Sequence, residues 1–429
     1  MSTFVEAVFP RRLGTGFRWL VASSWTSNLG DGLMMAAGPL LVASQTRNPV
    51  LVASAVMASQ LPWLLFGLVA GAIADRLDRR VVIMTMNGVR AVLLVGLVAV
   101  VWTGHVNIWL VLVALFAMGT AEVFADTTSS TLVPMLVDKS DLGIANARIM
   151  AGLITANQLA GPALGAVLFA VGTAVPFTLQ AACVALGVVL VSRIGTPPGA
   201  VREGVDSHIR QDIAEGMRWL VGNRPVRTLA LVIVTFNVTF AAPFSVLVLW
   251  AQERVGIGAA GYGLLTTASA LGGIVATVSY GRLERRVPLA TLMRVALLCE
   301  VVFHLAMALT TSFPVALGLM VFFGAYAFVW GTLSNAVRQR AVPTELQGRV
   351  SSVYMICVMG GMLLGSLLGG VIARQWGLTA PWWFAFAGAG ITLLLVWREL
   401  GHIAHADEAT EATAATEPSE TADGAGRTA

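Results

Sequence analysis

The chain has 429 residues, of which 57% are hydrophobic and only 12% are charged, with a formal net charge of +4. Soluble globular domains carry roughly 25% charged residues, so the composition excludes a soluble enzyme on a membrane tether and a chain that is disordered throughout. At roughly 20 residues per span, the apolar residues suffice for about twelve membrane-crossing helices. We therefore expect an all-α polytopic membrane protein.

Uncharged or nearly uncharged runs occur in two sets along the chain. The first set covers about 19–43, 49–74, 81–103, 107–133, 146–171 and 174–193. The second set covers about 228–251, 259–281, 288–310, 313–335, 350–373 and 380–399. The sequence thus predicts twelve transmembrane helices, six on each side of a polar central loop.

The polar segments complete the predicted organisation. In chain order we expect a cytoplasmic N-terminal segment (1–18), an N-terminal six-helix bundle (19–193), a cytoplasmic linker (194–227), a C-terminal six-helix bundle (228–400) and a tail (401–429). Apolar residues of the linker recur at helical spacing, which predicts an amphipathic helix on the inner membrane surface. The tail is acidic and rich in Ala and Thr, so we expect it to be disordered because it cannot bury enough apolar surface.

The basic residues predict the orientation. Of the 27 Lys and Arg residues, 22 fall on one side of the predicted membrane, while Arg47, Arg254 and Arg374 fall on the other and Arg90 and Arg294 lie inside spans. Because loops rich in Lys and Arg stay in the cytoplasm, both termini and the linker are expected there. The predicted location is the cell inner (plasma) membrane.

An internal repeat links the two halves of the chain. The pattern Arg-Leu-acid-Arg-Arg-Val occupies residues 76–81, after the second span, and residues 282–287, after the eighth. The two copies follow equivalent spans in the same orientation. This arrangement predicts two six-helix pseudo-repeats that rock around a site near the membrane midplane.

The first copy also carries a family resemblance. Residues 71–80, Gly-Ala-Ile-Ala-Asp-Arg-Leu-Asp-Arg-Arg, resemble the signature loop between spans two and three of the major facilitator superfamily. Residues 157–165 resemble the antiporter motif of that superfamily, whose core is Gly-Pro-x-x-Gly-Gly. Here Ala166 replaces the last glycine and Asn157 replaces an upstream one. The resemblance covers about 19–400 and implies the major facilitator fold.

Three further stretches are similar to one branch of that superfamily. They are residues 121–126 (Ala-Glu-Val-Phe-Ala-Asp), 132–134 (Leu-Val-Pro) and 145–148 (Ala-Asn-Ala-Arg). The branch comprises drug and siderophore exporters, including enterobactin exporters and macrolide efflux proteins. The resemblance implies that spans one, four, seven and ten line a central cavity.

Two motifs are expected to control conformation. Arginines at inner helix ends can bind helix C-terminal carbonyls or pair with acids of a neighbouring helix, which predicts a latch on the inner side; the alternative is that these arginines only set the topology. The predicted latch consists of Gly71, Asp75, Arg76, Arg79, Arg80, Arg282, Arg285 and Arg286. Gly161, Pro162 and Gly165 are predicted hinge and packing positions in span five.

Acids at membrane depth are the predicted proton-coupling residues. A charge near the bilayer centre costs at least about 2.5 kcal/mol, so such acids face protein or water and serve a function. Asp31 lies midway along span one, and Glu122 and Asp126 project from one face of span four. The alternative for Asp126 is a pair with Arg148 near the inner end.

Glu300 lies at the same depth, four residues before His304 in span nine. These two could form a proton pair, but because the resemblance places span nine on the outer scaffold we favour a buried structural pair. Arg90 and Arg294 are expected to pair or to reach the inner interface.

The predicted substrate cavity combines aromatic rings with amides, which suits a bulky amphipathic ligand. Its residues are Asn28, Asn237, Phe240, Phe244, Tyr326, Trp330 and Asn335. The alternative is that the aromatic side chains pack between helices or anchor at the membrane interface.

The sequence favours a secondary active transporter that exports bulky amphipathic molecules, such as a drug, macrolide or siderophore-like compound, in exchange for protons. Its expected partners are the small-molecule substrate, protons and the lipid bilayer, and we expect a monomer that binds no nucleic acid. No nucleophile–base set or metal-ligand spacing appears, so neither an enzyme nor a cofactor or metal site is expected. The alternatives are an uncoupled or lysophospholipid transporter and a non-transporting membrane sensor or scaffold.

Overall fold

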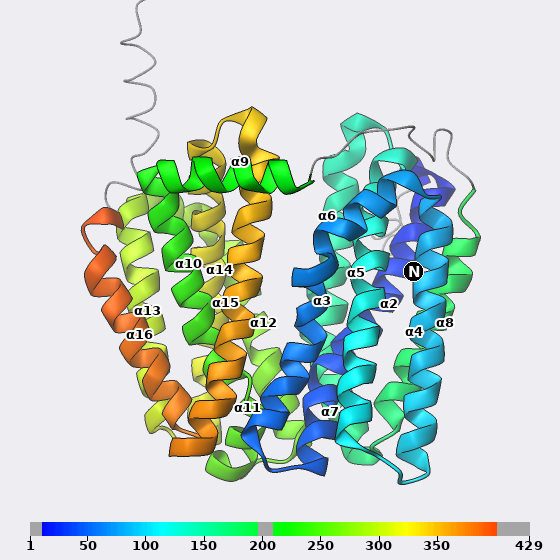
Figure 1. The fold of residues 1–429 in the computed structure, drawn as a ribbon, viewed down its shortest axis with the longest axis horizontal. Coiled ribbons are helices and arrows are strands. Elements are labelled where there is room, and N and C mark those ends of the chain that lie inside the picture. The colour runs from blue at the N-terminus through cyan, green and yellow to red at the C-terminus, as the bar shows by residue number, and fades with distance from the viewer. Residues whose placement is uncertain (1–10, 196–208, 401–429) are drawn as a thin grey trace, which may run out of the picture.

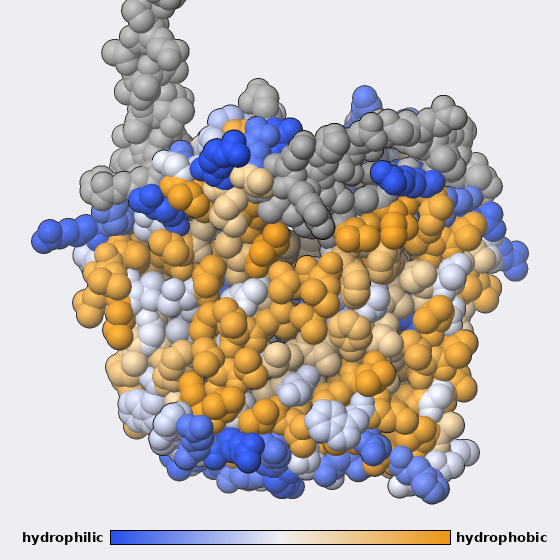
Figure 2. Space-filling view, in the orientation of Figure 1, coloured by the Kyte–Doolittle hydropathy of each residue, from blue (hydrophilic) through white to orange (hydrophobic). Residues whose placement is uncertain are grey.

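The regular structure of the described residues is helical throughout. A computed structural model describes residues 11–195 and 209–400. The predicted disordered tail, most of the N-terminal segment and the start of the linker lie outside these residues. Ten of the described helices are long and apolar enough to cross a membrane, and Figure 2 shows an apolar zone between two hydrophilic rims. The expected all-α polytopic class is thereby confirmed.

The first helix group comprises the helices before residue 196 (Figure 1). Its main helices are α2 (Gly14–Gln45), α3 (Pro49–Arg76), α4 (Arg79–Trp102), α5 (Ile108–Leu136), α6 (Leu142–Gly152), the π-helix η3 (Leu153–Ala160), α7 (Gly161–Val171) and α8 (Val175–Ser192). Short 3-10 helices, η1 (Arg11–Leu13) and η2 (Lys139–Asp141), precede α2 and α6.

The second helix group follows residue 208 and lies beside the first (Figure 1). It consists of α9 (Ile209–Gly222), α10 (Arg224–Phe244), α11 (Leu247–Trp250), the π-helix η4 (Ala251–Val255), α12 (Ala259–Arg286), α13 (Leu289–Leu309), α14 (Phe313–Ala341), the 3-10 helix η5 (Thr344–Leu346), α15 (Gln347–Trp376) and α16 (Ala380–Val396). The two ends of the molecule are named here the α9 end and the η4 end.

Two helices of the twelve-span prediction are absent from the ten. The helix α16 has 17 residues, slightly short of a full span. The helix α2 has 32 residues, but serines, Asn28 and Asp31 interrupt its apolar sequence. The polar residues that set α2 apart include Asp31, a predicted proton-coupling residue, which lies inside the first group.

Asparagine and aspartate side chains fix where several helices begin. Asn48, Asp78 and Asn107 accept hydrogen bonds from the backbone N–H groups two residues later. Asn223 accepts one from the backbone N–H of Val226. Such caps satisfy N–H groups that have no partner inside the helix, so the sequence sets the helix starts locally.

The two groups share one apolar core at the η4 end. The largest buried cluster contains Leu41 and Leu94 of the first group together with Trp250 and Trp382 of the second. Near the α9 end, the buried clusters contain residues of a single group each. The helices α3 and α15 pack together, as do α7 and α12. The groups are therefore joined most extensively at the η4 end.

Glycines allow α2 to approach the η3–α7 segment closely. A Cβ atom on Gly161 would overlap the backbone of Gly32, and one on Gly165 would overlap the backbone of Leu33. Pro162 has no N–H to donate into the preceding turn, and the π-helix η3 ends at Ala160, two residues before it. Small residues at a crossing let helix backbones touch, so Gly161 and Gly165 set the distance between these helices.

We predict that Gly161→Ala lowers the free energy of unfolding by roughly 1–3 kcal/mol, because the added methyl group overpacks the α2 crossing. Thermal unfolding in detergent measures the effect. The control is Gly96→Ala in α4, where a Cβ atom would have no neighbour within 4 Å. Equal melting temperatures for the two variants would contradict the proposed close contact.

Candidate functional site

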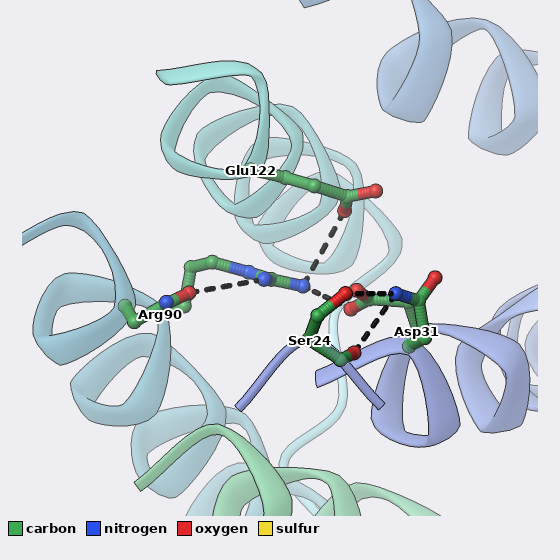
Figure 3. Close-up of polar contacts among 6 residues, drawn as sticks. Ser24, Asp31, Arg90 and Glu122 are labelled. Carbon is green, nitrogen blue, oxygen red and sulfur yellow. Dashed lines mark hydrogen bonds and ion pairs between the residues drawn. The ribbon is translucent and has the colours of Figure 1, made fainter. Parts of the chain in front are cut away.

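A guanidinium group lies between two carboxylates inside the first helix group. Arg90 on α4 reaches between Asp31 on α2 and Glu122 on α5 (Figure 3). Its Nη2 atom donates to Asp31 Oδ1 and lies 3.4 Å from Glu122 Oε2, while Nη1 donates to Asn87 Oδ1 at 3.2 Å. Side chains from three separate helices thus meet at one cation.

The three charged side chains differ in their exposed fraction. The side chains of Arg90, Asp31 and Glu122 are 2%, 9% and 31% exposed, respectively. A buried charge is tolerated only when it is paired and hydrogen-bonded, which accounts for the direct contact between Arg90 and Asp31. Glu122 is the more accessible partner and has the longer contact. It is therefore the member of the cluster that can change its charge at the lower structural cost.

The third predicted acid, Asp126, lies one helical turn after Glu122 and is exposed. Among the described residues, no ion pair joins Asp126 to Arg148, whose backbone carbonyl accepts a hydrogen bond from Trp25. The proton-coupling role of the three acids stays a prediction, but Asp31 and Glu122 are brought together by a residue that was not predicted as part of the site.

That residue is Arg90, which was expected either to pair or to reach the inner interface. The structure shows pairing. Arg294 instead donates to the carbonyl of Trp397 and lies 5.3 Å from the centre of its ring. The signal for Arg90 was available in the sequence, because a lone base in a span requires an acid nearby.

A pocket of about 320 Å³ lies between the two helix groups. It is lined by residues of α2, η3, α7, α12 and α14, among them Met35, Gln158, Pro162, Ser269 and Phe323. Mostly apolar walls with a few hydroxyl and amide groups are typical of small-molecule sites. Because both groups contribute walls, relative movement of the groups would change the shape of the pocket.

Besides Tyr326, two of the predicted cavity residues contact the lining of this pocket. Phe240 stacks on Phe323 with ring centroids 5.4 Å apart, and Phe244 packs against the same ring at 5.2 Å. Sequence reasoning did not select Phe323 or Gln158. An amide inside the apolar fifth span, within the antiporter-like motif, was a usable signal for Gln158.

The other predicted cavity residues make contacts within or between helices. Asn28 and Asn237 donate to carbonyls one turn earlier in their own helices. Trp330 stacks on Phe236, with ring centroids 6.0 Å apart. The remaining two also have side-chain partners: Tyr326 donates to Glu300, and Asn335 accepts from Arg338. Their role in substrate binding stays a prediction.

At the α9 end, two residues of the predicted latch bind neighbouring helices of the same group. Arg80 Nη2 donates to the Ser192 carbonyl at the end of α8, at 2.5 Å, and Arg79 Nε donates to Thr131 on α5, at 3.0 Å. Cations favour helix C-termini because the carbonyls there lack partners. These bonds brace α4 inside the first group.

The other predicted latch residues differ in position. Gly71 lies in α3 and is partly buried. The side chain of Asp75 lies outside the described part of the structure. The four arginines Arg76, Arg282, Arg285 and Arg286 are exposed at the α9 end.

At the η4 end, polar contacts join the two groups. Arg47, which follows α2, donates to Gln252 at 2.6 Å and lies 3.7 Å from Glu253 in η4. Deeper in the molecule, Thr267 on α12 donates to the carbonyl of Leu159 in η3 at 3.2 Å. A π-helix offers carbonyls in irregular positions, and here the second group supplies a donor.

Comparisons with known proteins give a consistent result. A profile of the family described as "Transmembrane secretion effector" matches residues 8–422. The chain is 27% identical to the multidrug efflux pump Tap of Mycobacterium tuberculosis, over 82% of this chain and 85% of that protein. It is 24% identical to the enterobactin exporter EntS of Shigella dysenteriae, over 90% and 92%.

A solved structure shows the same fold at low identity. It is a bacterial homologue of the iron transporter ferroportin in an inward-facing state. The TM-score is 0.70 at 17% identity, with 90% of this chain and 98% of that chain covered.

We predict that Arg90→Leu destabilises the protein by about 3–5 kcal/mol, because it leaves Asp31 buried without its partner. Chemical or thermal unfolding of the purified protein measures the loss. In the double variant Arg90→Leu with Asp31→Leu, most of the stability should return. The matched control is Arg12→Gln, which removes an exposed pair with Asp141 and should cost less than about 1 kcal/mol. Additive effects of the two leucine substitutions would contradict direct pairing.

Proposed function

The chain belongs to the major facilitator superfamily, in its drug and siderophore exporter branch, and from this premise we propose that it is a proton-coupled exporter of bulky amphipathic small molecules. We further propose twelve membrane spans in two six-helix bundles, 19–193 and 228–400, that alternate around the central pocket. The termini and the α9 end face the cytoplasm, and the exporter works as a monomer in the plasma membrane.

The arrangement of Asp31, Arg90 and Glu122 carries the proposal of proton coupling. One guanidinium serves two carboxylates, and Asp126 adds a third acid one turn away. With all four groups ionised, the cluster carries an excess of two negative charges, which repel each other strongly in a low-dielectric interior. Binding of a proton at Glu122 reduces that repulsion, and Arg90 then pairs with Asp31 alone.

Alternating access is supported by the difference between the two ends. The apolar core and the Arg47 contacts join the groups at the η4 end, whereas separate apolar clusters occupy the α9 end. With the proposed orientation, this is a state closed to the outside. Opening to the outside then requires loss of the Arg47 contacts and of the Thr267–Leu159 hydrogen bond.

The cargo class is supported by the pocket and by the relatives. Met35, Phe323 and Pro162 provide apolar surface, and Gln158 and Ser269 provide polar groups. No charged side chain is among the described residues that line it. Such walls bind by apolar burial and ring stacking, which tolerates varied ligands and fits relatives named as a multidrug efflux pump and an enterobactin exporter.

We predict that Glu122→Gln abolishes proton-driven export, because it removes the proton-binding carboxyl group, and that Asp31→Asn reduces export at least tenfold, because Arg90 then pairs with Glu122 alone and keeps it ionised. The protein is reconstituted in liposomes with an imposed proton gradient, and ethidium export and dye-dependent proton movement are recorded. The control is Glu215→Gln, which removes an exposed carboxylate paired with Arg349 at the α9 end. Ethidium export that persists in liposomes without a proton gradient would contradict proton coupling and favour uncoupled transport.

We also predict that Phe323→Ala weakens ethidium binding about three- to tenfold, since one aromatic contact contributes about 0.5–1.5 kcal/mol. Fluorescence titration of the purified protein measures the dissociation constant. Phe386→Ala is the matched control, because its ring pairs with Trp383 on α16 and does not line the pocket. An unchanged dissociation constant for Phe323→Ala would place the cargo elsewhere.

A further inference from the structure

A second polar cluster lies in the second helix group, and the proposed function does not use it. Glu300 and His304 on α13 have side chains that are 0% exposed. The hydroxyl of Tyr326 on α14 donates to Glu300 Oε2 at 2.5 Å, and His304 Nδ1 lies 3.5 Å from Glu300 Oε1. The rings of Phe303 and Trp382 pack around His304. Three polar groups are thus enclosed where apolar residues would cost less.

The cluster has more hydrogen-bonding atoms than partners. Glu300 Oε1 and both ring nitrogens of His304 are buried without a hydrogen bond. A carboxylate beside a neutral imidazole leaves a buried negative charge without a counterion, which is costly. One added proton removes that cost, whether it stays on the carboxyl group or moves to the imidazole. The pair is therefore built to hold one exchangeable proton.

Neighbouring helices supply no competing charge. Tyr326 is the titratable group that faces Glu300 from α14, and Cys299 is its neighbour on α13 itself. Among the described residues of α10, α13, α14 and α16, no Arg or Lys forms an ion pair with Glu300. In contrast to Asp31, this carboxyl group has no fixed cation, so its charge depends on the proton.

A small hollow beside Glu300 can hold one water molecule. Its volume is about 10 Å³, close to the minimum for one water, and its walls include Thr235, Thr239 and Thr392. Each of these hydroxyl groups donates to a carbonyl of its own helix. Their oxygen lone pairs remain as acceptors, so they can orient a water in the hollow beside Glu300.

Tyr326 connects this cluster to the pocket. Its ring lies 5.6 Å from that of Phe323, which lines the pocket, and 6.0 Å from that of Phe303. Cargo that displaces Phe323 must also shift Tyr326, because aromatic rings in contact cannot move independently in a packed core. A shift of Tyr326 changes the hydrogen bond that holds Glu300.

We propose that Glu300, His304 and Tyr326 form a second proton-binding site, whose proton is exchanged with water when cargo moves Phe323. The site rests on the proposed exporter function and adds one proton to each transport cycle. When Tyr326 shifts, the carboxyl–imidazole pair gives its proton to water that enters from the pocket, and it takes a proton back from that water later in the cycle. Glu122 is then the proton-binding residue of the first helix group, and Glu300 is that of the second.

The test is infrared difference spectroscopy of the full-length protein in lipid, with and without ethidium. A carboxyl C=O band should respond to ethidium, disappear in Glu300→Gln and shift in Tyr326→Phe, which removes only the hydrogen bond. The number of protons exchanged per ethidium should fall by about one in Glu300→Gln. Glu215→Gln should leave both readouts unchanged.

The outcomes separate this site from the proposed function. If Glu122→Gln lowers the proton count and Glu300→Gln does not, the exporter mechanism stands and the second site is overturned. If neither variant changes the proton count, both the proton-coupled mechanism and the second site are overturned. Should Glu300→Gln not fold, the band shift in Tyr326→Phe decides, and the absence of any ethidium-dependent shift there overturns the second site.

Discussion

The cost of burying a guanidinium group dominates the organisation of the first helix group. Arg90 is almost fully enclosed, and it is tolerated because Asp31 and Glu122 approach it from two other helices. This requirement fixes the rotation of α2, α4 and α5 about their axes. It also leaves Asp31 better paired than Glu122, and this asymmetry is why we propose Glu122 as the proton-binding carboxylate.

Close helix packing connects the Arg90 cluster to the pocket between the two groups. The helix α2 carries Asp31 and, one residue later, Gly32, which touches the backbone of the η3–α7 segment. That segment in turn packs against α12 of the second group and lines the pocket through Gln158 and Pro162. The Arg90–Asp31 pair and the pocket are thus separated by one tightly packed crossing.

The sequence predicted what depends on local pattern, and it missed what depends on distances between helices. Apolar runs predicted the class and the approximate helix limits, and membrane depth together with the family resemblance selected Asp31, Glu122 and Asp126. Arg90 was expected to pair or to reach the inner interface, but its partners were not predicted, because the rotation of one span relative to another cannot be calculated from spacing. Phe323 was likewise missed, since one more aromatic residue in an aromatic-rich span carries no signal until α10 packs beside it.

In the proposed mechanism, the charge state of the Arg90 cluster sets which end of the molecule is open. Pulsed electron paramagnetic resonance on a cysteine-free protein, with spin labels at Thr103 and Thr311 in exposed turns, measures the separation of the two groups across pH. We expect a pH-dependent distance distribution in the native protein and a single, pH-independent distribution in Glu122→Gln. The same pH dependence in both proteins would contradict it.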